Sequence, residues 1–355
     1  MANNKPYNEL SLLPPDKKVW EKIEVYKILT EARAALAELK GRCPVIPNPF
    51  MLINTLVLQE AKDSSSIENV FTTSDRLYKA FASSTVAADP QTKEVLRYRQ
   101  ALLTAWNEIQ KSEISIDIIE NIYRQIKEKQ DGVRDSQVFV GNAFQTIYIP
   151  PCCRDLLIQK LKNLIDFAAS EKETDPLIKM ALMHYQFEAI HPFTDGNGRA
   201  GRVLNVLYIS KWGLIDHPVL YLSKYINTYK NDYYRLLREV TENNNWTEWI
   251  IYMLTAVKET AIFTLNKVNA IFTLFLSTIE KMKNEAPGVY SFELVSLLFE
   301  QPYCKIGFVV EAGIASRNTA SKYLGKLVEI GVLEKELAGS EVLFLNKNLY
   351  DILVA

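Results

Sequence analysis

One short stretch carries several side chains whose types and spacing suit joint chemistry. It runs from His191 to Arg202 and reads His-Pro-Phe-Thr-Asp-Gly-Asn-Gly-Arg-Ala-Gly-Arg. His191 is the only imidazole near this point, and at neutral pH it is largely unprotonated, as a general base must be. Asp195 suits a divalent cation that also contacts phosphate oxygens, and Arg199 and Arg202 are neighbours on the expected helix. These residues predict a site for a polyphosphate, a metal ion and a base.

The flanking sequence predicts two helices that position this stretch. Asp175-Pro176 is typical of the N-cap and first residue of one helix, and Pro192 disfavours helical geometry at the residue before it. Gly196 and Gly198 permit a turn, after which a second helix is expected from near Gly198 to Gly213. A glycine-rich turn that feeds a helix N-terminus directs backbone N–H groups and the positive end of the helix dipole to one point. The implied ligand is an anion.

The stretch resembles the Fic motif, HPFx(D/E)GNGRxxR, at every defined position. The resemblance implies transfer of the AMP moiety of ATP to a hydroxyl side chain of a target protein. It also implies that His191 deprotonates the hydroxyl, that Asp195 holds Mg²⁺, and that the following residues cradle the phosphates. The ATP-binding set implied in this way is Gly196, Asn197, Gly198, Arg199, Ala200, Gly201 and Arg202. The alternative is a polar surface turn between two helices.

A second short pattern lies upstream of this stretch. Taken alone, Asp63–Phe71 predicts a helix N-terminus, with three serines before a glutamate that the helix dipole would stabilise. Ser64-x-x-x-Glu68-Asn69 also resembles the (S/T)xxxE(G/N) inhibitory motif of Fic proteins. By that resemblance Glu68 pairs with Arg202 where the γ-phosphate needs the arginine, and ATP then binds in a non-reactive pose. Plain helix capping is the alternative.

Between the expected helices, the apolar residues change from helical spacing to alternation, which predicts a β-hairpin. Its apolar residues alternate around Gly141-Asn142 and are Val138, Val140, Ile147 and Ile149. A lone two-stranded hairpin is only marginally stable, so we expect it to lie over another part of the chain. In the Fic family a hairpin called the flap precedes the motif and aligns the target backbone by strand addition. A purely structural hairpin is the alternative.

Length, charge and cysteine content limit the classes of protein to which the chain can belong. At 355 residues the chain suggests two or three domains, and 41 Lys and Arg against 42 Asp and Glu give a net charge of -1. No overall field therefore favours nucleic acid or an anionic membrane. We see no signal-peptide core and no apolar run of roughly 20 residues, so we expect a cytoplasmic protein that does not span a membrane. The four cysteines lack CxxC spacing and are expected to be ordinary thiols.

The last part of the chain predicts a winged helix-turn-helix. Phe292–Phe299, Phe308–Ala312 and a segment that opens at Ser316 are expected to be helices, and Val332–Glu336 and Glu341–Leu345 are expected to be strands. From Cys304 onward six Lys or Arg residues face six Asp or Glu residues, whereas DNA-binding domains normally carry a basic surplus. Protein interaction or packing on the Fic core is therefore favoured slightly over DNA binding.

Together these patterns predict a mainly α protein in three parts. They are an N-terminal helical region with the inhibitory motif (1–110), a Fic helical core with a β-hairpin flap (111–260), and a helical linker with a winged helix (261–355). The expected activity is Mg²⁺-dependent transfer of AMP from ATP to a Ser, Thr or Tyr hydroxyl of a target protein or of the chain itself, restrained by Glu68. Two alternatives stay open: an AMP-removing Fic enzyme in which Glu68 positions a water, and a nucleotide-responsive DNA-binding regulator. A homodimer is compatible with the sequence, which names neither the target nor the residues of the adenine pocket.

Overall fold

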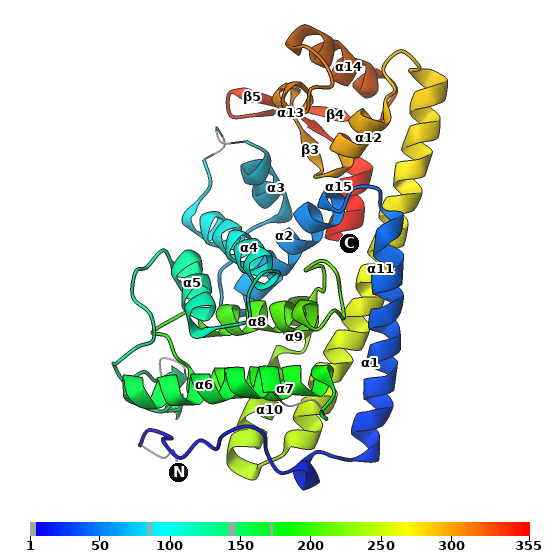
Figure 1. The fold of residues 1–355 in the computed structure, drawn as a ribbon. Helices are drawn as coiled ribbons and strands as arrows, with labels where there is room; N and C mark the ends of the chain where they lie inside the picture. Colours follow the sequence, from blue (N-terminus) through cyan, green and yellow to red (C-terminus); the bar gives the residue numbers. More distant parts are fainter. Residues whose placement is uncertain (1–4, 84, 86, 142–145, 171–172) are drawn as a thin grey trace.

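The computed structural model describes residues 5–355 apart from 84, 86, 142–145 and 171–172. The fold is mostly helical, as predicted (Figure 1). The elements up to the flap are η1 (Lys17–Val19), α1 (Ile23–Arg42), η2 (Cys43–Val45), α2 (Phe50–Ile67), α3 (Ser74–Ala82), α4 (Pro90–Ile109), α5 (Ile116–Lys127), β1 (Val140–Gly141) and β2 (Thr146–Tyr148). Those that follow are α6 (Arg154–Ser170), α7 (Pro176–Ile190), α8 (Asn197–Lys211), α9 (Leu222–Thr228), α10 (Lys230–Asn243), α11 (Trp246–Glu285), α12 (Phe292–Phe299), β3 (Tyr303–Cys304), α13 (Ile306–Glu311), α14 (Arg317–Glu329), β4 (Glu334–Ala338), β5 (Glu341–Leu345) and α15 (Lys347–Val354).

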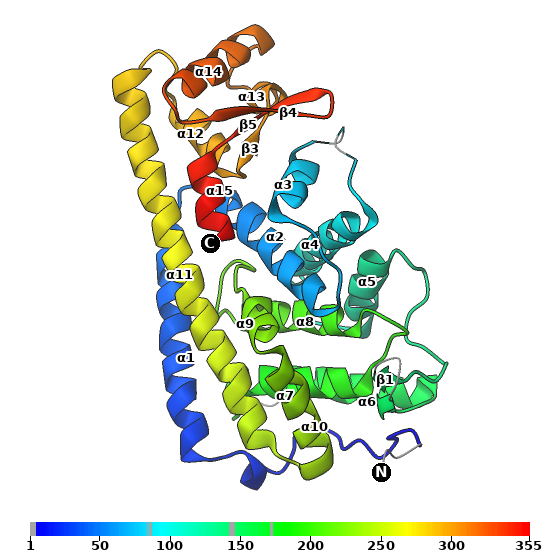
Figure 2. The ribbon, with the colours of Figure 1, turned by 180° about the vertical axis from the view of Figure 1, so that it is seen from behind.

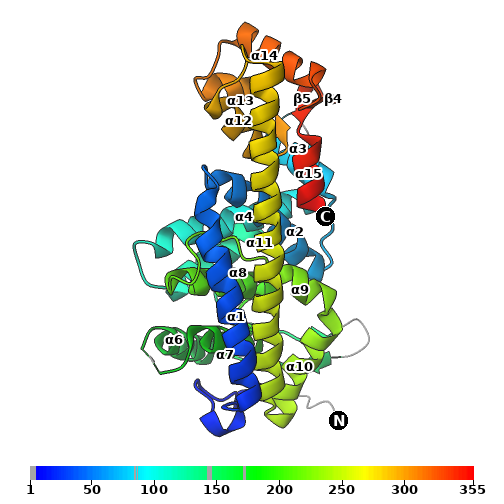
Figure 3. The same cartoon turned by 90° about the vertical axis from the view of Figure 1, so that its right-hand side faces the viewer.

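Two long helices from distant parts of the chain form one side of the molecule. α1 lies along the lower part of α11, and α11 continues upward to the C-terminal unit (Figure 3). The contact follows from an apolar stripe at helical spacing on α1, whose buried members include Val25, Leu29, Ala32, Leu36 and Leu39. Because α11 also packs against α7, α9 and α10, it joins the N-terminal helix to the core.

α11 also corrects one statement made from the sequence. Among the described residues, one helix, α11, is long and apolar enough, by length and composition, to cross a membrane, because an 18-residue window within it has a mean hydropathy of 1.4. The expectation that no apolar run approaches this length is therefore wrong for this helix. Several of its apolar residues, Trp249, Met253 and Val257 among them, are buried. Others, such as Ile262 and Leu276, are exposed, and only 39% of the apolar window is buried. Burial inside the fold therefore accounts for only part of the composition of the helix.

The helices that carry the motif lie at the centre of the lower part of the molecule. α7 and α8 pack on each other, α6 covers α7, and α4 and α5 pack on α8. The side chain of Asp175 caps α7 and Pro176 opens it, as predicted. The hairpin is present as well, with Val140 paired to Tyr148 (Figure 2). Its strands are shorter than predicted, and the predicted turn residue Asn142 lies outside the described residues.

The Asp63–Phe71 segment is not the helix N-terminus that its serines suggested. It is the C-terminal end of α2, where Glu68 is the C-cap and Asn69 has a left-handed φ of 61°. The Ser66 hydroxyl donates to the Asp63 carbonyl at 2.8 Å, so the serine satisfies a helix carbonyl and does not cap backbone N–H groups. The segment therefore presents Glu68 at the end of a helix rather than at its start.

The helix α1 does not begin directly after the capping residue Asp16. Asp16 caps the short helix η1, and α1 begins at Ile23 because Lys22 is extended. The proposed division into domains stays a prediction. α11 passes through its boundary at residue 260 without a break.

The C-terminal unit has the element order of a winged helix. α12, α13 and α14 precede the β4–β5 hairpin, and β3 completes an antiparallel sheet in the order β3-β5-β4. The sequence analysis missed β3, which has two residues, and α15. α15 packs on α2 and α11, and Lys267 of α11 donates to the carbonyls of Ile352 and Leu353 at 2.5 Å and 3.1 Å.

The wing of this unit, formed by β4, β5 and their turn, docks on the N-terminal region. The polar contacts that tie the C-terminal unit to this region include Glu341 with Ser83, Glu336 with Lys79 at 3.0 Å, and Tyr303 with Asp75 at 2.6 Å. Asp75 and Lys79 belong to α3, which follows the Glu68 segment in the chain. The C-terminal unit therefore contacts both α2, which ends at Glu68, and the next helix.

Candidate active site

The turn between α7 and α8 contains two residues in the left-handed region. His191 ends α7 with a φ of 50°, and its backbone N–H still donates to the Phe187 carbonyl at 3.0 Å. Gly196, with a φ of 77°, is the N-cap of α8, which begins at Asn197. Only residues 192–195 separate His191 from the N-cap, so the base and the start of a helix belong to one short turn.

Asn197 and Phe193 hold this turn in place. The Asn197 side chain accepts the Phe193 N–H and donates to the Phe193 carbonyl, both at 2.8 Å. Phe193 is fully buried and stacks on Tyr123 of α5 with ring centroids 4.2 Å apart, so its side chain anchors the loop to the core. Since the Asn197 side chain serves the turn itself, its backbone N–H at the start of α8 is the group left for an anion.

His191 is in the protonation state that a general base needs. Its Nδ1 lies 3.3 Å from the Glu188 carbonyl oxygen, which favours a proton on Nδ1 and a lone pair on Nε2. Burial lowers the pKa of His191 to about 4, and the Arg134 charge adds to this shift while the Glu188 carbonyl opposes it. The imidazole is therefore neutral at pH 7.

Arg202 is held by the segment that resembles the inhibitory motif. Its Nε donates to Ser64 Oγ at 2.8 Å, and its Nη2 donates to the Ser64 carbonyl at 2.9 Å and to Glu68 Oε1 at 2.8 Å. Burial alone would raise the pKa of Glu68, but the charge of Arg202 and its hydrogen bond lower it. We call Arg202 with Glu68 the Arg202 pair. Asn69 follows Glu68 with a left-handed backbone, and within the described part of the chain it makes no hydrogen bond or ion pair with the arginine.

The Arg202 pair explains why position 198 is a glycine. A Cβ on Gly198 would collide with Glu68 Oε1 and would lie 2.9 Å from Arg202 Nη1. Two motif residues further from the turn have a packing role. Ala200 is buried, and a Cβ on Gly201 would lie 2.7 Å from the Glu188 carboxyl, so both let α8 approach its neighbours closely. Contact of either residue with ATP stays a prediction.

Arg199 has a partner that the sequence did not reveal. This arginine, only 2% exposed, forms an ion pair with Glu94 near the start of α4. Glu94 Oε1 also pairs with Lys127 Nζ at 2.9 Å, and Lys127 Nζ lies 2.6 Å from Asp195 Oδ2. Burial alone would raise the pKa of Asp195, but the hydrogen bond and charge of Lys127 lower it. We call these four residues the Arg199 network.

Models of three known sequence families match the chain. The one described as Fic/DOC family covers residues 112–209, which include the whole turn and both arginines. The Fic/DOC family N-terminal model covers residues 26–107, and the model for the C-terminal domain of protein adenylyltransferase SoFic-like covers residues 274–349.

The chain belongs to the Fic/DOC family.

Individual relatives match over shorter stretches of this Fic chain. Protein adenylyltransferase fic-1 of Caenorhabditis elegans is 34% identical over 108 residues, which are 28% of this chain and 20% of that protein. Protein adenylyltransferase Fic of Nematostella vectensis is 31% identical over 160 residues, which are 42% of this chain and 33% of that protein. The chain therefore matches only a fifth to a third of the length of these two curated relatives.

Solved structures show the same fold. A Fic family protein from Desulfovibrio desulfuricans G20 superposes with a TM-score of 0.57 at 18% identity, over 91% of this chain and 96% of that chain. A Fic domain containing signaling protein from Bacteroides thetaiotaomicron gives a TM-score of 0.53 at 18% identity, over 67% of this chain and 98% of that chain. At such low identity these likenesses show the Fic fold alone.

Arg134 is a buried residue that ties the flap of the Fic core to the motif. Its Nε donates to the His191 carbonyl and its Nη2 to the Pro151 carbonyl, both at 2.8 Å, and its backbone N–H donates to the Pro192 carbonyl at 2.9 Å. Arg134 lies in the stretch before the flap, which resembles the same stretch of Fic proteins, but the resemblance assigns it no contact. Nothing in the sequence pointed to Glu94 or Lys127, which lie on ordinary amphipathic helices.

Asp195 suits a magnesium ion that takes its other ligands from a nucleotide and water. Among the described residues, no group of three or more His, Cys, Asp or Glu side chains could hold a metal. Asp195 supplies one ionised carboxylate that is 59% exposed, next to the start of α8. One carboxylate with phosphate oxygens and water is a usual arrangement for Mg²⁺, so the donor chemistry fits.

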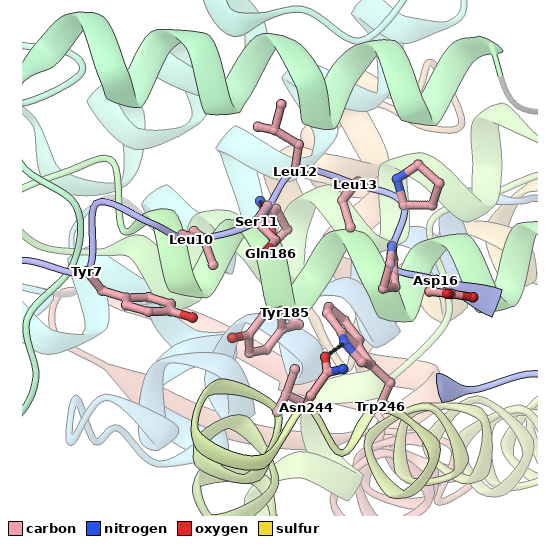
Figure 4. A pocket seen from close by; sticks show the side chains of 13 residues that line it. Tyr7, Leu10, Ser11, Leu12, Leu13, Asp16, Tyr185, Gln186, Asn244 and Trp246 are labelled. Carbon is pink, nitrogen blue, oxygen red and sulfur yellow. Dashed lines mark hydrogen bonds between the residues drawn. The ribbon is translucent and has the colours of Figure 1, made fainter. Parts of the chain in front are cut away.

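A cavity of about 260 Å³ lies away from this turn (Figure 4). It separates the N-terminal segment from α7, α10 and α11, and its lining includes Tyr7, Tyr185 and Trp246. Gln186 on its wall donates to the Ser11 carbonyl at 2.8 Å, which fastens the N-terminal segment to α7. None of residues 191–202 lines it, so we assign the chemistry to the turn.

Proposed function

We propose that this chain transfers the AMP moiety of ATP to a hydroxyl side chain of a target protein, and that Glu68 restrains the reaction. The observation that carries the proposal is the convergence of a neutral His191, the start of α8 and two buried arginines at one turn. The names of the curated relatives, protein adenylyltransferases, support the same activity. Since the matched segments are parts of those proteins, the activity, nucleotide and target are proposals for this chain.

The chain's own groups account for the steps of this reaction. His191 Nε2 accepts the proton of the target hydroxyl while the hydroxyl oxygen bonds to the α-phosphorus. The bond from that phosphorus to the bridging oxygen breaks, and pyrophosphate leaves. The N–H groups at the start of α8 and the two guanidinium groups offset the charge of the phosphates, and their fixed positions orient the α-phosphate.

Asp195 is the residue that would hold Mg²⁺ in this proposal. A bound ion there would neutralise part of the triphosphate charge and help to orient the phosphates. The support is the donor chemistry of a single ionised carboxylate at an anion site. The Lys127 ammonium now neutralises that carboxylate.

The restraint follows from the Arg202 pair. A guanidinium that donates to Ser64 and Glu68 has fewer donors for a γ-phosphate, and the Glu68 carboxylate repels that phosphate. ATP that cannot place its γ-phosphate would sit with the α-phosphate out of line with His191. Phe139 and Ile147, beside and in the flap strands, are exposed and thus accessible to an incoming target segment.

Removal of AMP from a modified protein is a second candidate, and one observation favours it. Glu68 Oε1 lies against Gly198 at the start of α8, a few residues after His191, and the Glu68 carboxylate is ionised because, against the effect of burial, Arg202 lowers its pKa. A carboxylate in that place can orient a water for attack on the phosphorus. Release of AMP by the parent chain, and its loss in Glu68→Gly, would support this candidate.

We further propose that the chain acts in the cytoplasm and that its C-terminal unit serves packing or protein contacts rather than DNA binding. The support is the even charge of that unit and the docking of its wing on Ser83 and Lys79. Gel shifts with random duplex at physiological salt should show little retention. A micromolar complex would favour the DNA-binding regulator.

Labelling with α-labelled ATP tests the main proposal. The full chain, Glu68→Gly and Glu68→Gly/His191→Ala are each incubated with Mg²⁺ and a cell lysate. We expect label on protein with Glu68→Gly and its loss in the double variant, while His191→Ala binds nucleotide nearly as well as the parent. Undiminished labelling by the double variant would rule out His191 as the base.

A further inference from the structure

The residue that approaches Asp195 most closely as a counter-ion comes from outside the motif. Lys127 is the last residue of α5, and its Nζ lies 2.6 Å from Asp195 Oδ2 and 2.9 Å from Glu94 Oε1. No role for it follows from the motif, since Lys127 is 64 residues upstream of His191 on a different helix. It nevertheless contacts the one carboxylate expected to bind the metal.

The side chain of Lys127 packs against the turn between α7 and α8. Its side chain is only 16% exposed, and its methylene stem lies against Gly196, where an added Cβ would come within 3.1 Å of Cγ and Cδ. Its ammonium also lies where the helix dipole of α5 is negative, which favours a cation. A lysine on the protein surface that reaches a carboxylate by chance would not be covered in this way.

The position of this ammonium excludes a metal ion on the same oxygen. Magnesium binds carboxylate oxygens at roughly 2.0–2.1 Å and repels a nearby ammonium. Lys127 has a second anion, Glu94, which it already contacts. It can therefore leave Asp195 without leaving its ion pair with Glu94, and Glu94 keeps its contact with Arg199.

We propose that Lys127 is a positioning residue that neutralises Asp195 when no metal is bound and withdraws to Glu94 when Mg²⁺ binds with the nucleotide. Lys127 thereby sets the coupling between metal and nucleotide: it supports metal-free nucleotide binding and competes with the metal. This inference rests on the proposed magnesium role of Asp195. It goes beyond that role by assigning a second residue that determines when the metal can enter.

The coupling can be measured without any transfer reaction. Isothermal titration calorimetry of the full chain with ADP, once in EDTA and once in saturating Mg²⁺, gives two Kd values. Their ratio is the metal coupling, and the affinity of Mg²⁺ for free ADP cancels when two proteins are compared. The variants are Lys127→Met, which keeps the stem without the charge, and Lys127→Arg, which keeps the charge.

The matched control is Lys129→Met, two residues further along. Lys129 Nζ lies 3.5 Å from Thr194 Oγ1, so the control also removes a cation beside the turn without touching Asp195. In Lys127→Met we expect the ratio of the EDTA Kd to the Mg²⁺ Kd to rise by about fivefold. This factor corresponds to the free energy that one partly exposed ion pair contributes. The ratio should stay near the parent value in Lys127→Arg and in Lys129→Met.

The outcomes separate this inference from the proposed function. A parent chain that binds ADP with no metal coupling would contradict the role of Asp195 in the proposed function, and the inference would fall with it. A parent with metal coupling and a Lys127→Met variant with the same or a smaller ratio would overturn the inference alone. If Lys127→Met unfolds, Lys127→Gln is measured in its place, and the same rise is expected.

Discussion

The two arginines of the motif are neutralised in different ways. In the Arg202 pair, Glu68 is the C-cap of α2, its side chain is 31% exposed, and the chain turns away at Asn69. In the Arg199 network, Glu94 lies inside α4, is 17% exposed and binds two cations. An acid at a helix end can leave its partner by a local change of backbone, whereas an acid inside a helix and a network cannot. The first arrangement suits regulation, and the second suits a fixed position for Arg199.

Substitution of Glu68 should give the largest effect on activity. In Glu68→Gly the Arg202 guanidinium is free for the γ-phosphate, and the α-phosphate can align with His191. We expect the initial rate of labelling of target or self to rise by about tenfold or more, because misplacement of reacting groups costs that much in rate. The measurement compares parent and variant at equal ATP and Mg²⁺.

The control for that prediction removes the other member of the Arg202 pair. Glu68→Gly/Arg202→Ala should lose the gain, since the arginine is the group that Glu68 is proposed to withhold. Equal rates for the parent and Glu68→Gly would mean that Glu68 only ends a helix. A double variant as fast as Glu68→Gly would assign the gain to something other than Arg202.

The pH dependence of transfer by the Glu68→Gly variant tests whether the pKa of His191 is lowered as its burial implies. The pKa of His191 is lowered to about 4, so the neutral base persists as the pH falls below the ordinary histidine value and is lost only as it approaches 4. The charge of Arg134 favours this shift, and Glu68 and Asp195 oppose it. We expect kcat/KM with saturating Mg²⁺ to stay level through pH 6.5. A half-maximal rate at that pH would contradict the burial of the imidazole.

Substitution of Glu94 should lower the free energy of unfolding, whereas substitution of Glu68 should change the rate of transfer. Glu94→Ala leaves Arg199 buried without its ion pair, which we expect to cost about 2 kcal/mol of unfolding free energy. Urea unfolding measures it, with Glu108→Ala, an exposed acid on the same helix, as the control. Labelling faster than that of the parent chain would instead make Glu94 a second restraining residue.

The smallest effect is expected at the contact between the C-terminal unit and α3. Tyr303→Phe removes the hydrogen bond to Asp75 and should lower the unfolding free energy by about 1 kcal/mol. The labelling rate should not change, because the Arg202 pair is held by α2. A rise of severalfold would show that the docking of this unit helps to hold Glu68 in place.

The sequence predicted the parts of the fold and site whose causes are local. A proline, two glycines and a capping aspartate determine where α7 ends and α8 begins, so His191 and the arginines were found with their positions on the two helices. The contact between Glu68 and Arg202 followed from a resemblance, and the structure contains it. The local pattern around Glu68 was misleading, because serines suit an N-terminus as readily as they donate to carbonyls at a helix end.

The residues that the sequence did not reveal depend on contacts between distant elements. Glu94 and Lys127 come from α4 and α5, and only the packing of both helices on α8 brings them to Arg199 and Asp195. A charged residue near the end of an amphipathic helix has the same pattern whether it faces solvent or an active site. α15 was missed for a similar reason, because its apolar residues acquire partners through distant elements such as α2 and α11.

The pairing of α1 with α11 determines the order in which the chain can become stable. More than 200 residues separate the end of α1 from the start of α11, and α15, which covers α2, is made later still. During synthesis the apolar stripe of α1 therefore stays uncovered until most of the protein has left the ribosome, a period in which such a surface is prone to aggregation. The same delay applies to α2, because α15 packs on it and is the last helix to be made.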